Sequence, residues 1–347
     1  MTESTWDRVT SLKAVITDSG QQDCQIYANG LNRISVTVFI ECRDTDDKVM
    51  EVPLDHLADK TQFIQYTSKE KLTWNGSSGW CYTHQKNQFT AIPDLGSGKK
   101  PDGVGQQITF YVYCSSDTAT SINIGVHVAT DTGKDFWLSY DSESFHTPVN
   151  FQPKAPFAYG IDDVDWRHEK ASYWLPDVYK ENEWKFNPVN YYLSCKRPRF
   201  KFVTFDAHSY QSAAPRYNKM CVYQLTSQGP DYSHWYAWFH GAYVWDDEPH
   251  EKAQMIAGAS NAFFNLGDSL VTVYDSGASD KNWSLCFTWV ESGNSKEGSY
   301  CFDSVEEGFS GARLDWGTYV IVYDQYGNSG RFDLDTSDIL NSLGIKA

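Results

Sequence analysis

Residues 34–42 read Ile34-Ser-Val-Thr-Val-Phe-Ile-Glu-Cys42, a run dominated by β-branched and aromatic side chains. Such side chains suit a pleated, half-buried surface, and their alternation with polar residues is typical of a β-strand. Residues 107–114 and 121–128 repeat the pattern, and breaks rich in Gly and Ser separate these runs at 75–79 and 96–103. Short strands with turn residues between them predict a β-sandwich in this part of the chain.

The same pattern returns near the other end of the chain, at residues 269–274 and 318–323. Between the two strand-rich parts, the segment 147–156 holds three prolines in ten residues. Proline restricts its own backbone and that of the preceding residue, which favours an extended linker. We therefore expect an N-terminal sandwich-like domain over residues 1–153, and a second domain over residues 154–347.

Aromatic residues make up 16% of the 347 residues, with 22 Tyr, 19 Phe and 13 Trp. Many of them fall in residues 157–260, the least regular part of the pattern. The fold class expected from the sequence is mostly β, with two sandwich-like parts joined by an aromatic-rich irregular middle segment. We expect few short helices, from Glu248 to Ala257 and at 336–343 before Gly344, and a short helical or turn segment at residues 54–59.

The formal net charge of −16 disfavours a nucleic-acid partner, because an acidic chain repels the phosphate backbone. No run approaches the roughly 20 apolar residues of a transmembrane helix, so no transmembrane segment is expected. The first residues also lack the basic and apolar regions of a secretory signal peptide. We expect a soluble protein that is either secreted by a route without a classical signal peptide or cytoplasmic.

Eight cysteines are present, and none forms a Cys-x-x-Cys pair of the kind found in zinc and redox sites. Cys286 and Cys301 flank the turn-forming residues 292–295. A two-residue turn at Gly293 and Asn294 predicts a hairpin in which the two cysteines face each other within disulfide range. Two reduced, buried thiols are the alternative, and the sequence leaves the choice open.

The N-terminal part carries one family resemblance. Tyr27-Ala-Asn-Gly30, the strand-like run 34–41 and the polar turn Asp44-Thr-Asp-Asp-Lys48 resemble the opening of bacterial immunoglobulin-like domains of the invasin type. The family has a glycine in that turn, and this chain has none. The resemblance implies a β-sandwich and a bacterial, host-facing role in adhesion. The chain also resembles soluble accessory proteins encoded beside bacterial pore-forming toxins, which implies a virulence role.

Catalytic motifs are absent from the sequence. It contains no Gly-x-Ser-x-Gly, no His-Glu-x-x-His, no Walker loop and no dinucleotide-binding glycine pattern. No cofactor or metal is therefore expected. Acidic turns occur at 44–47, 162–165 and 333–338, and Asp162, Asp163 and Asp165 are the best candidates for calcium. Solvated turns are the alternative explanation.

Two groups of residues are candidates for ligand binding. One is the only basic cluster, which would bind an anionic group, unless it guards a strand edge. The other is the aromatic run 232–245, which would stack on sugar rings or a membrane interface, unless it is packed core. The predicted anion ligands are Lys196, Arg197, Arg199 and Lys201, and the predicted stacking residues are Tyr232, Trp235, Tyr236, Trp238 and Tyr243.

The leading functional hypothesis is a non-enzymatic binding protein that recognises a host glycan, a lipid or membrane surface, or a partner toxin component. One alternative is a carboxylate-based glycan hydrolase, which would use Asp246, Asp247 and Glu248. Another is a subunit of a pore-forming assembly, in which strands 107–114 and 121–128 would form the inserting hairpin.

Overall fold

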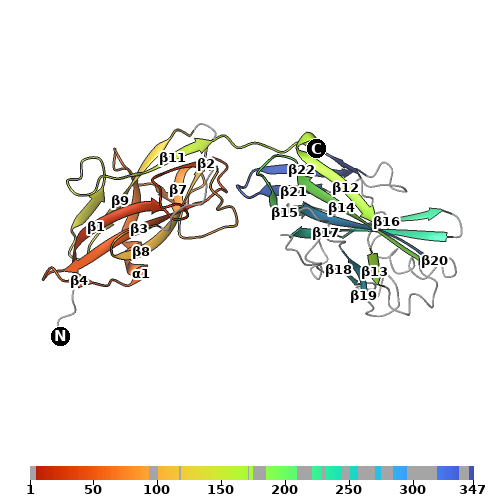
Figure 1. Ribbon diagram of the computed structural model, residues 1–347, viewed down its shortest axis with the longest axis horizontal. Coiled ribbons are helices and arrows are strands. Elements are labelled where there is room, and N and C mark those ends of the chain that lie inside the picture. The colour runs from red at the N-terminus through yellow and green to blue at the C-terminus, as the bar shows by residue number, and fades with distance from the viewer. Residues whose placement is uncertain are drawn as a thin grey trace. The chain divides into compact units, whose positions relative to one another are not determined.

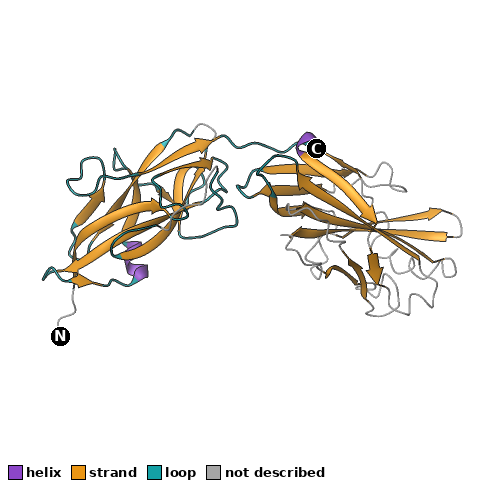
Figure 2. Ribbon diagram, in the orientation of Figure 1, coloured by secondary structure: helices purple, strands orange, loops and turns teal. Residues whose placement is uncertain are grey.

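The chain is seen in a computed structural model, whose described residues form mostly strands (Figure 2). Within them there is one α-helix, α1 (Leu54–Asp59), where the sequence predicts a helical or turn segment, and one 3-10 helix, η1 (Ile161–Asp163). The predicted mostly-β class is confirmed, while the sandwich packing stays a prediction. The structure describes residues 5–93, 101–116, 119–170, 172–174, 185–208, 221–228, 231–243, 251–256, 270–274, 284–294, 319–335 and 344–347.

The chain divides into two compact units. The first contains residues 1–157 and 325–328, and the second contains residues 158–324 and 329–347. The sequence places a boundary after residue 153, and the first unit runs on to Phe157 before the chain enters the second.

The first unit contains two sheets (Figure 1). In one, the strand order is β1-β3-β8-β7-β6, with β4 beside β3; in the other it is β10-β9-β11-β2, with β5 beside β9. All neighbours are antiparallel except the pairs β6–β7 and β2–β11. The bounds are β1 (Trp6–Ile16), β2 (Asp23–Tyr27), β3 (Ile34–Asp44), β4 (Val49–Met50), β5 (Thr61–Gln65), β6 (Thr73–Trp74), β7 (Gly79–Thr83), β8 (Gln106–Ser115), β9 (Ile122–Ala129), β10 (Asp135–Leu138) and β11 (Val149–Lys154).

Both sheets of the first unit contribute to one hydrophobic core, which contains Val36 and Val38 of β3 and Val126 and Val128 of β9. Strand β3, the most strand-like run in the sequence, is buried on both faces over most of its length. Its polar residue Thr37 is buried as well, and its hydroxyl lies 2.9 Å from that of Thr17 on the neighbouring chain segment. The hydroxyls thus pair with each other, as buried polar groups must.

The described residues of the second unit form three sheets, with strand orders β12-β14-β20-β17-β16, β13-β19-β18 and β15-β21-β22-β23. The middle of the chain, expected to be irregular, forms strands over most of its described residues, which also include η1 and the turn at 196–201. The bounds are β12 (Val164–Lys170), β13 (Ser172–Trp174), β14 (Lys185–Cys195), β15 (Phe202–His208), β16 (Cys221–Gln228), β17 (Asp231–Tyr243), β18 (Glu251–Ile256), β19 (Leu270–Tyr274), β20 (Ser284–Asn294), β21 (Tyr319–Asp324), β22 (Ser329–Asp335) and β23 (Gly344–Lys346).

Two local predictions are wrong. Residues 251–256, expected to be helical, form strand β18 and pair antiparallel with β19. Pairing with a neighbouring β-branched strand here outweighs the helix propensity of the segment. The predicted helix at 336–343 lies outside the described residues.

The predicted turn at Gly293 and Asn294 is the second error, because β20 continues through both residues and Gly293 lies opposite Ser233 of β17. An inner strand with partners on both sides keeps its extended backbone despite a glycine. Cys286 therefore lies opposite Tyr192 and His240 in the sheet. Cys301 lies outside the described residues.

Candidate functional site

A pocket of about 380 Å³ opens in the first unit. Four parts of the chain supply its walls: the loop after β2, the loop between β6 and β7, one residue shortly after β7 and the end of β8. None of the ten lining residues is an Asp, Glu, His or Cys, so their functional groups are amides, hydroxyls and one guanidinium. The lining consists of Asn29, Gly30, Leu31, Arg33, Asn75, Gly76, Ser77, Gln85, Tyr113 and Ser115.

The loop after β2 is held in shape by two asparagines. Asn29 Oδ1 accepts two backbone N–H groups of its own loop, each at 2.9 Å. Asn32 is fully buried; its Oδ1 accepts the Tyr27 N–H, and its Nδ2 donates to the carbonyl oxygens of Phe89 and Ala91, all at 3.0 Å. The pocket wall is thus fixed by hydrogen bonds between neutral groups.

Two residues of the pocket have left-handed backbone conformations. Gly30 has a φ of +76°, and a Cβ there would lie 3.2 Å from the Ser115 side chain. Asn75 has a φ of 49°, and its N–H donates to the Tyr82 carbonyl at 3.0 Å. Glycine and asparagine adopt this conformation at the least steric cost, so both turns follow from the residue type.

Arg33 forms part of the same wall. Its Nη1 donates to the Gln85 carbonyl at 2.8 Å, and its Cζ lies 5.2 Å from the centroid of the Tyr113 ring. The Tyr113 hydroxyl in turn donates to the Gly76 carbonyl at 2.7 Å. The guanidinium is therefore held between two lining residues.

Several polar side chains of the pocket have hydrogen-bonding capacity to spare. Within the described part of the chain, no partner is in place for the side chains of Asn75, Ser77, Gln85 and Ser115. An amide side chain can both donate and accept, and so can a hydroxyl. These groups are available to a ligand that carries many hydroxyls.

An exposed aromatic residue adjoins the pocket in the sequence. Trp74, the residue before Asn75, is 44% exposed. Its ring meets those of Tyr82 and His84 edge-on, at centroid distances of 5.0 and 4.8 Å, and His84 stacks on Phe110 at 4.5 Å. The Trp74 ring is thus held by packing while part of its surface stays open.

The predicted basic cluster occupies the turn between β14 and β15 in the second unit. There the structure brings it together with a predicted calcium ligand, because Arg197 Nε donates to Asp163 Oδ1 at 2.8 Å. The Arg197 guanidinium holds the pKa of Asp163 below its usual value, with help from a hydrogen bond donated by Gly160. The Asp163 carboxylate therefore stabilises the turn through its contacts with Arg197 and Gly160. The other three basic residues, Lys196, Arg199 and Lys201, are exposed.

A buried pair lies beneath this turn. The Tyr159 hydroxyl donates to Asp324 Oδ2 at 2.7 Å, and both residues are buried. Arg197 Cζ lies 5.6 Å from the Tyr159 ring, which also contacts Phe202 edge-on. Burial raises the pKa of Tyr159, so the hydroxyl keeps its proton and remains a donor. These contacts give Arg197 an anchoring position in the fold.

The predicted stacking residues fall on β17, an inner strand between β16 and β20. Alternate positions of a strand belong to opposite faces, and β17 has a bulge between His240 and Ala242. In the register with β20, Trp235 lies opposite Glu291. The other four predicted residues, Tyr232, Tyr236, Trp238 and Tyr243, lie opposite Asn294, Val290, Thr288 and Ser284.

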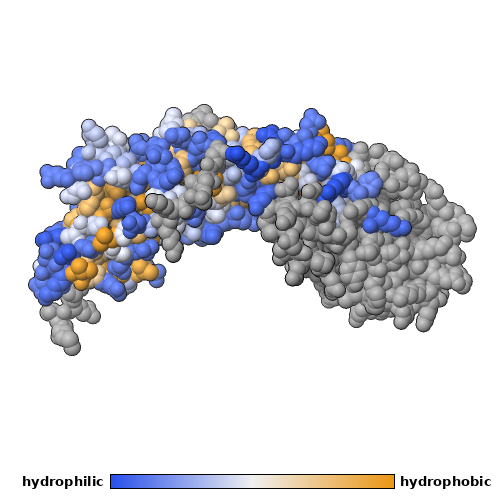
Figure 3. Space-filling model, viewed as in Figure 1, coloured by the Kyte–Doolittle hydropathy of each residue, from blue (hydrophilic) through white to orange (hydrophobic). Residues whose placement is uncertain are grey.

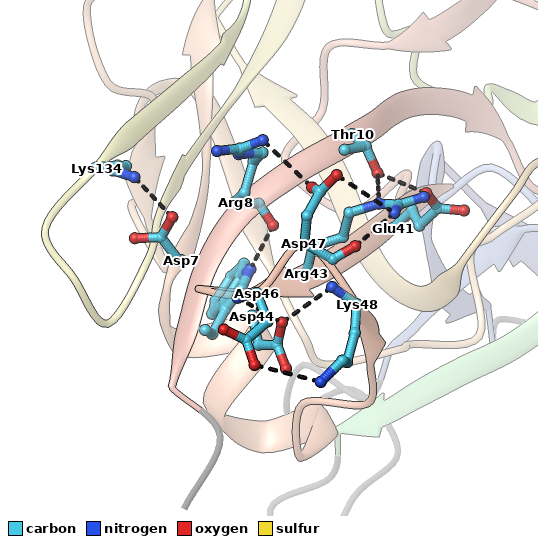
Figure 4. Close-up of polar contacts among 11 residues, drawn as sticks. Asp7, Arg8, Thr10, Glu41, Arg43, Asp44, Asp46, Asp47, Lys48 and Lys134 are labelled. Carbon is cyan, nitrogen blue, oxygen red and sulfur yellow. Dashed lines mark hydrogen bonds and ion pairs between the residues drawn. The ribbon is translucent and has the colours of Figure 1, made fainter.

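The acidic turn at residues 44–48 is built from internal contacts (Figure 4). Asp44 Oδ1 accepts the N–H groups of Asp46 and Lys48, each at 2.9 Å. Asp47 Oδ1 lies 3.2 Å from Arg8 Nη1. In the described residues no group of three or more His, Cys, Asp or Glu side chains is placed to hold a metal ion. The carboxylates Asp246, Asp247 and Glu248 lie outside those residues.

The surface of the first unit also carries exposed apolar side chains. Val49, Leu54 and Val104 are more than half exposed. On the face drawn in Figure 3, hydrophilic residues predominate over the coloured part, with smaller hydrophobic areas between them. Single exposed apolar residues are ordinary and need no ligand to explain them. Among the described residues, no helix is long and apolar enough to cross a bilayer.

Strands β8 and β9, the candidates for an inserting hairpin, belong to different sheets. β8 pairs with β3 and β7, whereas β9 pairs with β5, β10 and β11. They do not form a hairpin with each other in this structure.

Comparison with known proteins adds no relative: no family model matches the chain, and no curated protein matches it.

The pocket was not predicted from the sequence. The available signals were Tyr27-Ala-Asn-Gly30 and the break at residues 75–79, which indicate turns without showing that these turns meet.

Proposed function

We propose that this protein is a non-enzymatic carbohydrate-binding protein, and that the pocket of the first unit is its saccharide site. One observation carries the proposal: the lining combines amides, hydroxyls and one guanidinium, and four of its polar side chains have no partner in the described chain. The resemblance to invasin-type domains adds support for a glycan on a host surface.

The chemistry of the lining matches that of a sugar. Each sugar hydroxyl can donate and accept a hydrogen bond, and so can the side chains of Asn75, Ser77, Gln85 and Ser115. The volume of about 380 Å³ is near the lower end of the roughly 300–1,000 Å³ typical of small-molecule sites. The exposed face of Trp74 offers an apolar surface of the kind that stacks on sugar rings. We therefore infer that the pocket takes the end of a glycan.

Binding is favoured over hydrolysis at this pocket. Glycoside hydrolysis needs two carboxyl groups roughly 5 to 9.5 Å apart, one on each side of the scissile bond. The pocket lining contains no carboxylate. A lipid or protein partner would use the basic turn instead, but there Arg197 already pairs with Asp163.

The test is binding of the fluorescently labelled full chain to an immobilised glycan array. Two variants remove pocket groups: Gln85→Ala, and Asn75→Gly, which keeps the left-handed backbone favourable. We expect each to weaken binding to the best glycan by about 2- to 10-fold, the effect of one lost neutral hydrogen bond.

The matched control is Gln107→Ala, which removes an exposed glutamine on β8 that does not line the pocket. It should bind as the unmodified protein does. Absence of binding to every glycan on the array would contradict the proposal. Equal losses in the control and the pocket variants would contradict the location of the site.

A further inference from the structure

The pocket contains a single cation, and that cation is only partly used by the fold. The Arg33 side chain makes one hydrogen bond in the described chain, from Nη1 to the Gln85 carbonyl. Its Nε is buried and has no acceptor, and no described residue accepts from Nη2 either. A ligand cannot reach the buried Nε, so Nη2 is the unpartnered nitrogen that remains to contact one.

This nitrogen has a defined chemical complement. The guanidinium keeps its positive charge, and a hydrogen bond from it to a carboxylate oxygen is charge-assisted and roughly twice as strong as one between neutral groups. The lining holds no Asp or Glu that could take this place.

We propose that the pocket selects saccharides that carry a carboxylate, and that Arg33 binds this carboxylate through Nη2. This inference rests on the proposed saccharide site. The neutral side chains around Arg33, among them Asn75 and Gln85, would then bind the hydroxyls of the same sugar. The guanidinium is held for this role by Gln85 and by the Tyr113 ring.

The net charge of the chain does not by itself favour an acidic sugar. The chain carries a net charge of −16, so its long-range field repels an acidic sugar. A general affinity for anions is therefore not expected from the chain as a whole. A preference for an acidic sugar would have to come from a local contact, and Arg33 is the charged residue of the pocket.

The experiment compares three probes with the full chain at one fixed salt concentration: the methyl glycosides of glucuronic acid and of glucose, and glucose 6-sulfate. Titration calorimetry or ligand-observed NMR gives the affinities. We expect the glucuronic acid glycoside to bind at least about tenfold more tightly than the glucose glycoside, as a charge-assisted hydrogen bond implies.

Two variants locate the effect. Arg33→Gln removes the charge, and Arg33→Lys keeps a charge but loses the planar guanidinium. We expect the ratio of the two affinities, acid over neutral glycoside, to approach one in Arg33→Gln and to fall several-fold in Arg33→Lys. Arg8→Gln is the matched control, because Arg8 lies in the same unit outside the pocket lining. Thermal unfolding checks that each variant is folded.

The outcomes separate the two proposals. Equal binding of the acidic and neutral glycosides overturns the role of Arg33 and leaves saccharide binding standing. Equal binding of the sulfate and the carboxylate overturns carboxylate selection. A preference that survives in folded Arg33→Gln overturns the assignment to this residue. If none of these probes and no array glycan binds, both proposals fail.

Discussion

The pocket of the first unit and the basic turn of the second differ in how their polar groups are used. At the pocket, Asn32 holds the wall through three hydrogen bonds to backbone groups, while neighbouring side chains keep spare capacity. At the turn, the most buried cation of the cluster, Arg197, is paired with Asp163 and lies against Tyr159. The basic cluster, which stands out in the sequence, thus contributes Arg197 to the stability of the second unit. The pocket is formed mainly by neutral residues that do not stand out in the sequence.

The largest effect is expected from Asn32→Ala. This change removes three hydrogen bonds from buried or partly buried backbone groups, so the free energy of unfolding of the first unit should fall by about 3 kcal/mol. Glycan binding should weaken with it, because the wall loses its support. Urea unfolding monitored by tryptophan fluorescence measures the change.

Asn123→Ala is the control for that comparison. Asn123 is exposed and accepts a hydrogen bond from Asn150 at 2.8 Å. Its loss should change stability by less than about 0.5 kcal/mol. Similar effects of the two substitutions would contradict the view that buried neutral hydrogen bonds hold the pocket.

A smaller effect is expected from Tyr159→Phe in the second unit. The ring stays, but the buried Asp324 carboxylate loses a donor, and stability should fall by about 1 to 2 kcal/mol. The matched variant is Tyr323→Phe, whose hydroxyl donates to the exposed Asp206 at 2.9 Å. It should lose less than about 1 kcal/mol. A larger loss in Tyr323→Phe than in Tyr159→Phe would refute this ordering.

The pair of Asp163 and Arg197 predicts a pH dependence. The folded-state pKa of Asp163 lies below its ordinary value of 3.8, so its stabilising contribution is present above that pH. This contribution is lost as the pH falls through the lowered folded-state value. Because the pair is partly exposed, we expect at most about 1 kcal/mol from it.

The measurement is the difference in unfolding free energy between the unmodified protein and Asp163→Asn, from about pH 5 down to about pH 2. Taking the difference removes the titration of the other carboxylates. The difference should shrink as the pH falls. A difference that stays constant would show that ionisation of Asp163 does not stabilise the turn.

The smallest effect is expected at the acidic turn of the first unit. Lys48 and Asp46 form an ion pair of 3.2 Å, but their side chains are 73% and 70% exposed. Exposed pairs of this kind contribute little, because water and salt screen them. Lys48→Gln should leave the melting temperature unchanged within error. A clear decrease would show that this exposed ion pair stabilises the first unit.

The sequence was most informative where local pattern and burial agree. The run 34–42 predicted a strand and lies in β3, and residues 54–59, predicted as a helical or turn segment, form the helix α1. The helix predicted at residues 251–256 and the turn predicted at Gly293 were wrong, because pairing with neighbouring strands overrides local preference there. In both cases the pairing involves residues outside the local segment, so local propensity could not show the outcome.

For the candidate sites, the sequence supplied the basic cluster but not its partner. Asp163 and Arg197 lie 34 residues apart, and only strand pairing brings them within 2.8 Å. The pocket is harder still to see, since Arg33, Asn75 and Gln85 are ordinary residues in separate segments. The proposed saccharide site thus depends on contacts that no single segment encodes.

By itself, the sequence determined the mostly-β class and the break at residues 75–79, because β-branched alternation and turn-forming residues are properties of short segments. Only the tertiary structure decided which polar groups are paired and which remain available. That distinction depends on which strands lie side by side, and strand pairing is set by packing between residues distant in the chain.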